Sequence, residues 1–262
     1  MKGRWTVVMS AGLLQGCVDT GNELIDGLNL FTVEEDMELG RQLRDEIAAS
    51  PDEYPLLDEG QHPEIYNHLF AMRDAILDTP DVEYADTFDW ELYVIDDDET
   101  LNAFAAPGGY IYVYSGLIEF LEHEDELVGV LGHEIAHADQ RHSTQQLTKA
   151  YGVQALLTLL VGEDPGLAAS MVEGLVNLSF GRSDETEADT YSVLYLCETV
   201  WAADGAAGFF EKLEGIEIPE FLSTHPSSET RVSDIQDMAD SLGCDTVLYP
   251  DGDYDEVVNS LP

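Results

Sequence analysis

The residues best suited to chemistry lie in the run His133-Glu134-Ile135-Ala136-His137. On an α-helix, residues four apart lie one above the other on the same face, so His133 and His137 can direct two imidazole nitrogens at one Zn²⁺ ion. Glu134 follows one position round the helix, where its carboxylate can take a proton from a water molecule at the metal. The spacing therefore predicts a catalytic zinc site with Glu134 as the general base.

The residues around this run argue against a chance match. They are mostly apolar, which predicts a buried helix: Leu127, Val128, Val130, Leu131, Ile135 and Ala136. Two unpaired imidazoles in a buried helix would be costly unless they share a partner. We expect Asp125 to cap this helix and the helix to continue to about His142. His142 would then lie about 140° round the helix from His137 and should not share the metal. Gln140 and Ser143 exclude the longer HExxHxxGxxH pattern.

A catalytic zinc site needs a third protein ligand. The histidine candidates are His123, His142 and His225. Glu163 is a carboxylate candidate, but it lies in a Gly/Pro turn that would hold it loosely. Glu185 and Asp189 are better placed, because they open an expected helix and share one face of it. Glu185 can bind the metal while Asp189 accepts the spare N–H of a ligating imidazole. Without the upstream histidines, both would be interpreted as solvent-facing acids.

The remaining pattern predicts an α+β domain that is mainly helical. Apolar periodicity indicates helices at 33–49, 63–77, 185–200 and 227–242, and one or two small-residue helices within 144–180 that could roof the site. His62 and His68 are interpreted as surface or packing residues.

Three β-rich segments at 90–95, 102–106 and 110–114 predict a small sheet beside the metal-binding helix, and Pro107-Gly108-Gly109 joins the last two. The strand immediately before the metal-binding helix could offer an open edge to an extended peptide, although an ordinary hairpin explains the pattern as well.

The charge is strongly negative, with 54 acidic against 10 basic residues and a formal net charge of -44. We therefore expect neither nucleic acids nor anionic membrane surfaces as partners, because both would be repelled. We interpret the charge as an adaptation for solubility in a salty environment. Hydrophobic residues make up 44% of the chain, which is typical of one globular domain.

The first residues resemble an export signal. Lys2 and Arg4 precede an apolar stretch, and Leu14-Gln15-Gly16-Cys17 resembles a bacterial lipobox. We expect a signal peptide at 1–16, a lipidated Cys17 and a tether at 17–31. No stretch approaches the roughly 20 apolar residues of a membrane-spanning helix, so only the lipid would anchor the protein.

The expected domain covers residues 32–248, and 249–262 is interpreted as an acidic tail. Cys197 and Cys244 remain after lipidation of Cys17. An exported compartment would permit a disulfide between them, but two buried free thiols fit the sequence equally well.

These motifs together resemble the gluzincin peptidases that include HtpX and the CAAX prenyl endopeptidase. The resemblance rests on His133-Glu134-x-x-His137 and Glu185-x-x-Ala188-Asp189, and on further landmarks in the family's order: Asn102-Ala103-Phe104, Pro107-Gly108-Gly109, Gly116-Leu117-Ile118, Arg182, Thr224-His225-Pro226 and Arg231. It covers roughly residues 33–242. The lipobox makes the chain most similar to the family's bacterial periplasmic lipoprotein branch.

The resemblance implies roles for individual residues. His133, His137 and Glu185 would be zinc ligands, Glu134 the catalytic acid/base, and Asp189 the carboxylate behind a ligand. His225 and Arg231 would lie at the cleft, where either could donate to a developing oxyanion. His225 could alternatively occupy the open position of the zinc in a resting state.

The sequence and the resemblance together predict a zinc-dependent endopeptidase that acts on unfolded or misassembled proteins of the cell envelope. It would lie on the periplasmic face of an outer membrane or on a cell surface, and the envelope type stays open. One alternative is a lipid-anchored chaperone or binding module with a structural metal, for which His225 is the evident fourth ligand. An aminopeptidase of related type is a third possibility.

Overall fold

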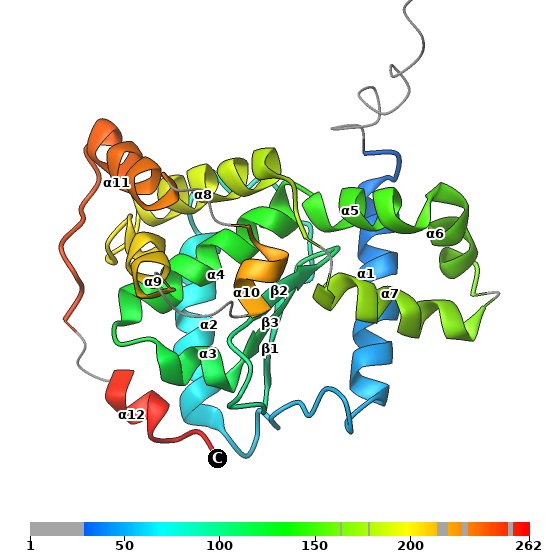
Figure 1. Ribbon diagram of the computed structural model, residues 1–262. Helices are drawn as coiled ribbons and strands as arrows, with labels where there is room; N and C mark the ends of the chain where they lie inside the picture. The colour runs from blue at the N-terminus through cyan, green and yellow to red at the C-terminus, as the bar shows by residue number, and fades with distance from the viewer. Residues whose placement is uncertain (1–28, 163, 178, 214–219, 227–229, 251–253) are drawn as a thin grey trace, which may run out of the picture.

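The computed structural model describes residues 29–162, 164–177, 179–213, 220–226, 230–250 and 254–262. The expected signal peptide, the lipidated Cys17, most of the tether and Glu163 lie outside these ranges. Within them, helices surround one three-stranded sheet (Figure 1). The expected mainly helical α+β class is confirmed.

The expected helices at 33–49 and 63–77 are observed with those bounds. In chain order the elements are α1 (Val33–Ala49), α2 (Pro63–Leu77), β1 (Glu91–Ile95), β2 (Ala103–Ala106), β3 (Tyr110–Tyr114), α3 (Ser115–Phe120), α4 (Glu124–Asp139), α5 (His142–Tyr151), α6 (Val153–Leu160), α7 (Pro165–Asn177), α8 (Arg182–Leu196), α9 (Gly205–Leu213), α10 (Glu220–Thr224), α11 (Arg231–Leu242) and α12 (Tyr254–Val258). The segment 144–180 thus belongs to three helices rather than one or two.

The sheet has the strand order β1-β3-β2, with β3 in the centre. β3 pairs in parallel with β1 and antiparallel with β2, which it follows through a turn containing Gly108 and Gly109 at φ values of 78° and 92°. Glycine tolerates these values without a side-chain clash. The open edge considered for the strand immediately before the metal-binding helix is wrong, because β3 is the central strand and is paired on both sides. β1 and β2 are the outer strands, and the Ser143 hydroxyl of α5 donates to the Ala105 carbonyl of β2 (2.6 Å).

Successive side chains of the strands enter two separate cores. One face of the sheet packs with α2, α3, α4, α8, α9 and α11 through aliphatic residues: Leu92, Val94, Ala105, Ile111 and Val113. The opposite face packs against α1, α5, α6 and α7 through aromatic residues: Phe104, Tyr110, Tyr112 and Tyr114. The two-residue period of a β-strand produces this division. The sheet is therefore enclosed between two helical layers (Figure 1).

Helix α4 is buried along its whole length and starts two residues earlier than expected. His123 is its N-cap, and the Glu126 carboxylate accepts from the His123 backbone N–H (3.2 Å). Asp125 is not the cap. Its carboxylate accepts instead from the backbone N–H groups of Ala202 (2.6 Å) and Tyr249 (2.9 Å). This buried acid therefore links α4 to the chain around α9 and α11.

Helix α4 also ends earlier than expected, at Asp139. Arg141 takes a left-handed φ of 62°, and α5 begins at the next residue. The Arg141 guanidinium pairs with the Asp36 carboxylate and donates to the Phe31 carbonyl (2.6 Å). The turn after the metal-binding helix is thereby tied to the start of α1. Phe31, expected at the end of a tether, is 4% exposed and belongs to the aromatic core.

Helices α8 and α11 lie side by side over α4 and α9. Gly181 is the N-cap of α8, and its N–H donates to the Asp184 carboxylate (3.2 Å). A disulfide between Cys197 and Cys244 joins the ends of the two helices. The structure thus decides the cysteine state that the sequence left open.

The last residues do not form a free acidic tail in the described part of the chain. Tyr254 at the start of α12 is 1% exposed, and its hydroxyl donates to the Ile118 carbonyl (2.8 Å). Val257 belongs to the same core as α2 and α4. The segment 254–262 therefore packs against the domain rather than beyond its boundary at residue 248.

Candidate metal centre

Helices α4 and α8 bring the three expected ligands together. His133 and His137, one turn apart on α4, place their Nε2 atoms 3.0 Å apart. Glu185, in the first turn of α8, has Oε1 3.4 Å from His137 Nε2 and Oε2 3.6 Å from His133 Nε2. All three side chains are buried. The two imidazoles of α4 thus lie beside a carboxylate from about fifty residues later in the chain.

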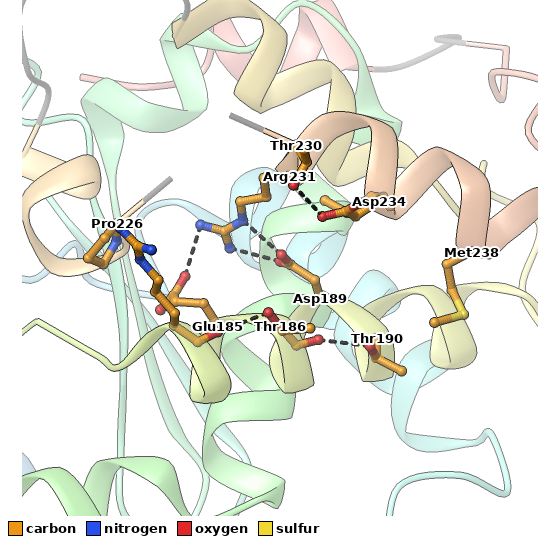
Figure 2. A pocket seen from close by; sticks show the side chains of 11 residues that line it. Glu185, Thr186, Asp189, Thr190, Pro226, Thr230, Arg231, Asp234 and Met238 are labelled. Carbon is orange, nitrogen blue, oxygen red and sulfur yellow. Dashed lines mark hydrogen bonds and ion pairs between the residues drawn. The ribbon is translucent and has the colours of Figure 1, made fainter. Parts of the chain in front are cut away.

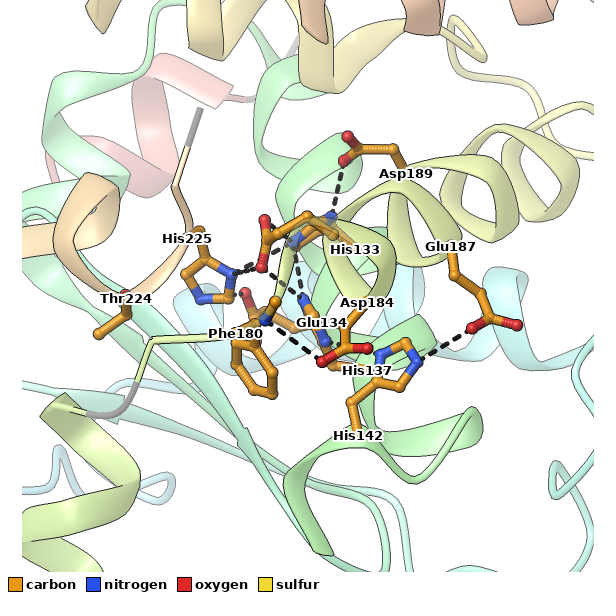
Figure 3. A network of polar contacts seen from close by, with 12 residues as sticks. His133, Glu134, His137, His142, Phe180, Asp184, Glu187, Asp189, Thr224 and His225 are labelled. Carbon is orange, nitrogen blue, oxygen red and sulfur yellow. Dashed lines mark hydrogen bonds and ion pairs between the residues drawn. The ribbon is translucent and has the colours of Figure 1, made fainter. Parts of the chain in front are cut away.

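His225, directly after α10, completes a group of four possible metal donors (Figure 3). Its Nδ1 lies 3.3 Å from His133 Nε2 and 3.1 Å from Glu185 Oε1. With Zn–N and Zn–O bonds of about 2.0–2.1 Å, tetrahedral ligand atoms lie about 3.4 Å apart. The donor separations within this group match that value, so the residues fit a zinc ion. His225 is therefore the fourth residue that could bind such an ion.

The charges of these groups suit metal binding. Burial lowers the pKa of His137 well below its ordinary value, which keeps the imidazole neutral and its lone pair available. Burial alone would raise the pKa of Glu185. The surrounding His225, His137 and His133 outweigh it and lower that pKa far below the usual range. Glu185 is therefore an ionised carboxylate.

Glu134 points at the same centre but has no hydrogen-bond partner among the described residues. Its side chain is fully buried, and neither carboxylate oxygen has a hydrogen-bond partner in the described chain. His225 Nε2 lies 3.5 Å from Glu134 Oε1. Burial raises the pKa of Glu134 to about 7. A buried carboxylate without partners is costly, and it indicates a site shaped for a cation, a water molecule or a substrate.

Asp189 and Arg231 support the His133 side of the centre. Asp189 Oδ1 lies 2.9 Å from His133 Nδ1, so this carboxylate can accept the spare N–H of the imidazole, as expected. The Arg231 guanidinium makes two hydrogen bonds of 2.8 Å to Asp189 and lies 2.8 Å from Glu185 Oε2. It also lies over the Phe210 ring, 3.8 Å from the ring centroid. Arg231 thus positions two carboxylates here, and its donation to an oxyanion stays a prediction.

His142 supports the His137 side, which the sequence analysis did not anticipate. The two Nδ1 atoms lie 2.9 Å apart, and His142 Nε2 lies 3.4 Å from Glu187 Oε2 (Figure 3). His142 is not among the four metal donors, as expected, but the reason differs. The helix breaks at Arg141, so the angle round a continuous α4 does not apply. The left-handed turn returns His142 to His137, and no pattern in the sequence shows that turn.

Two aromatic rings cover the metal donors. Phe221 stacks on His225 with ring centroids 4.4 Å apart, and Phe180 stacks on His137 at 4.0 Å. Backbone bonds hold both covers in place: Phe221 N–H donates to Leu101 (3.2 Å), and Phe180 N–H donates to Thr224 (2.9 Å). The centre is closed in this conformation, with His133, His137, Glu185 and His225 all at most 3% exposed.

Residues 72–239 match the model of peptidase family M48. The match includes every metal donor and both supporting residues, Asp189 and Arg231. The chain belongs to this family. The M48 assignment agrees with the resemblance found in the sequence and with the helical fold around a small sheet.

Named proteases are similar to a little over half of this chain. The mitochondrial metalloendopeptidase OMA1 of Schizosaccharomyces pombe is 33% identical over 157 residues, or 56% of this chain and 46% of that protein. The metalloprotease YcaL of Escherichia coli is 30% identical over 159 residues, covering 56% and 61%. The beta-barrel assembly-enhancing protease of Escherichia coli is 30% identical over 173 residues, covering 58% and 35%. The matched region thus spans less than two thirds of each relative.

The candidate ligand His123 and the two histidines interpreted as surface or packing residues, His62 and His68, are not among the metal donors. His123 caps α4 and His62 caps α2. His68 Nε2 lies 3.6 Å from the Glu124 carboxylate.

Among the described residues, no helix is both long and apolar enough to cross a membrane.

Proposed function

We propose that this M48 protein is a zinc-dependent endopeptidase. One observation carries the proposal. Four possible metal donors converge, and the fully buried Glu134, one residue after the first donor, has no hydrogen-bond partner among the described residues. A structural metal site needs only the donors. The unpartnered Glu134 carboxylate has a role only when a proton has to be accepted and donated beside the metal.

Each residue then has a defined task in peptide hydrolysis. His133, His137 and Glu185 would hold the ion, which supplies Lewis acidity that activates water and polarises the peptide carbonyl. Glu134 accepts a proton at its carboxylate from the attacking water and later donates it to the leaving amine. Asp189 holds the His133 ring in the tautomer that leaves Nε2 free for the ion. The aromatic covers exclude bulk water around these groups.

In this proposal, the resting and the active state of the site differ in whether His225 binds the metal. It occupies the position that hydrolysis requires for water and substrate, and catalytic zinc sites keep one such position open. We propose that His225 is the resting ligand and leaves that position when a peptide binds. Its Nε2 has no hydrogen-bond partner in the described chain, and movement would give up the contacts of its Nδ1 with Glu185 (3.1 Å) and His133 (3.3 Å).

The same observation favours one rival. Four protein donors are the usual set of a structural zinc site, so the centre could stabilise a chaperone or binding module without turnover. The rival assigns no task to Glu134. It predicts that removing His225 weakens the metal site and creates no activity.

We propose further that the substrates are unfolded or misassembled envelope proteins and that a lipid on Cys17 anchors the enzyme outside the cytoplasm. The support is the lipobox-like run and the similarity to the Escherichia coli protein named a beta-barrel assembly-enhancing protease. The disulfide between Cys197 and Cys244 is consistent with an oxidising compartment.

The deciding experiment compares the zinc-loaded full chain with its Glu134→Gln and His225→Ala variants on an unfolded protein in high salt. We expect cleavage by the parent chain, a loss of at least a hundredfold in Glu134→Gln, and retained or higher cleavage in His225→Ala. Equal cleavage by Glu134→Gln would disprove the mechanism. One zinc per chain without cleavage in the parent and in His225→Ala would favour the structural rival.

A further inference from the structure

The basic residues of this protein are almost all engaged in ion pairs. Of the ten, Lys2 and Arg4 precede residue 29, which leaves eight in the described ranges. Seven of these lie within 4.0 Å of a carboxylate: Arg41, Arg44, Arg73, Arg141, Lys149, Lys212 and Arg231. With 54 acidic residues in the chain, a cation is expected to find a partner.

Arg182 is the exception within the described part of the chain. It is the first residue of α8, it is exposed, and no carboxylate there lies within 4.0 Å of its guanidinium. Arginine is suited to bind a planar carboxylate through two parallel hydrogen bonds. In so acidic a protein, an unpaired arginine keeps this capacity for a ligand.

The position of Arg182 makes that capacity relevant to the metal centre. It lines a pocket between α8 and α11 whose wall also includes the metal donor Glu185, one turn further along α8, and Arg231 (Figure 2). The apolar part of the lining includes Ile235 and Met238 of α11. At about 310 Å³ the pocket lies at the small end of ligand sites, which suits one or two peptide side chains.

The acids at this pocket are already engaged. Asp189 is bound twice by Arg231, and the Asp234 carboxylate accepts from the Thr230 hydroxyl at 2.7 Å. Beside Arg182, the Asp184 carboxylate accepts from Gly181 N–H and lies 3.9 Å from Lys149. These bonds keep the nearby carboxylates from Arg182, so its positive charge faces the pocket and the solvent.

The pocket is held at both ends. The Arg231–Asp189 bonds join α11 to α8 beside the metal centre, and the Cys197–Cys244 disulfide joins the same helices at their far ends. A pocket that is formed before binding loses less conformational entropy when a ligand enters.

We propose that this α8–α11 pocket is a substrate subsite in which Arg182 binds a carboxylate of the peptide. The carboxylate is either an Asp or Glu side chain close to the scissile bond or the carboxyl terminus of a short substrate. The inference rests on the proposed peptidase function and adds to it a preference for acidic peptides. The surrounding surface is strongly negative and repels a carboxylate, so Arg182 provides the position at which the peptide carboxylate binds.

The test uses two randomised decapeptide mixtures, one with free carboxyl termini and one with terminal amides. The zinc-loaded full chain is incubated with each, and cleavage sites are read by mass spectrometry. We expect a three- to tenfold enrichment of Asp and Glu at one position within about three residues of the cleaved bond. If the terminus is the bound group, the free-carboxyl mixture is cleaved faster by a similar factor and the internal enrichment is absent.

Four variants separate the subsite from a general effect. Arg182→Gln should abolish the preference, Arg182→Glu should turn it towards Lys and Arg, and Arg182→Lys should retain most of it. An acidic residue at this helix N-terminus is compatible with the helix dipole, so Arg182→Glu should fold. Arg41→Gln, which removes an exposed arginine of α1, should change nothing.

The outcomes distinguish this inference from the proposed function. Cleavage without any carboxylate preference, or a preference that Arg182→Gln retains, overturns the subsite. A parent chain that cleaves no better than Glu134→Gln overturns the peptidase function instead. The subsite is then judged by fluorescence anisotropy, with a labelled decapeptide carrying central Glu and its Gln counterpart added to the zinc-loaded chain. Equal affinities for the two peptides, or a difference that Arg182→Gln keeps, overturn the inference.

Discussion

The two metal-binding histidines are supported in different ways, although they lie one turn apart on α4. Behind His133, a buried carboxylate is bound by a buried guanidinium, and α11 is joined to α8 by a disulfide. Behind His137, the partner is the imidazole of His142, and the carboxylate that His142 contacts in turn, Glu187, is 51% exposed. The first side is charged and cross-linked, whereas the second is neutral and partly open to solvent.

This difference indicates where the strength of the metal site originates. Removing Asp189 takes away the partner that Arg231 binds twice and leaves it only Glu185, and removing a partner from a buried ion pair is strongly destabilising. Removing His142 takes away one bond between neutral groups, whose net contribution is smaller. The two sides should therefore differ in both metal affinity and stability when they are disrupted.

The largest effect is expected for Asp189→Ala. It removes the acceptor of the His133 N–H and leaves the buried Arg231 with Glu185 as its remaining carboxylate partner. We expect zinc affinity to fall about a hundredfold and the free energy of unfolding to fall by about 3–5 kcal/mol. Chelator competition and urea unfolding measure the two quantities. Asp189→Asn, which keeps one acceptor oxygen but removes the charge, should lose less; equal losses would show that the charge alone matters and that the acceptor oxygen does not.

The carboxylates of Asp189 and Glu134 should respond to pH in opposite ways. Burial raises the pKa of Asp189, but the hydrogen bond to His133 and the charge of Arg231 outweigh it and lower that pKa below its usual range. Asp189 therefore contributes stability that is present above its unfolded pKa and is lost only in strong acid. Glu134, with its pKa raised to about 7, binds its proton more tightly in the folded state.

For the metal-free chain, Glu134 should lower stability as the pH rises from its unfolded pKa towards about 7. The full cost, on the order of 3 kcal/mol, applies above that pH. In the presence of a chelator, Glu134→Gln should thus be more stable than the parent at pH 8, and nearly equal to it at pH 4.5. Urea unfolding at both pH values measures this, and a constant difference between the two proteins would contradict it.

The disulfide behind His133 should contribute about 3 kcal/mol to the free energy of unfolding, because it closes a long loop between α8 and α11. Replacing both cysteines, Cys197→Ser with Cys244→Ser, should lower urea stability by that amount and weaken zinc binding modestly. The single replacements serve as controls for the thiol itself. Unchanged stability in the double variant would show that the remaining packing already holds the two helices together.

The smallest effect is expected on the His137 side. His142→Leu removes the acceptor of the His137 N–H, and zinc affinity should fall about tenfold. His142→Asn places an amide oxygen near the former Nδ1 position and should restore most of that affinity. Chelator competition at one pH measures all three proteins. A loss as large as that of Asp189→Ala would show that the two sides are equivalent.

Local periodicity accounts for the parts of the structure that were predicted correctly. The spans of α1 and α2 follow from apolar residues repeated at helical intervals, and the turn between β2 and β3 follows from Pro107-Gly108-Gly109. The errors occur where a residue far along the chain decides the outcome. β1 covers β3, and Arg141, bound to Asp36 and Phe31, ends α4 early.

The sequence by itself determined the chemistry of the site. Residues four apart on one helix share a face, so His133 and His137 form a pair in any fold that keeps α4 helical, and the same reasoning places Glu185 with Asp189 on α8. Only the tertiary structure decided which groups meet that pair. His225, His142, the disulfide and the unpaired Arg182 each depend on how separate helices pack, and no local pattern encodes those distances.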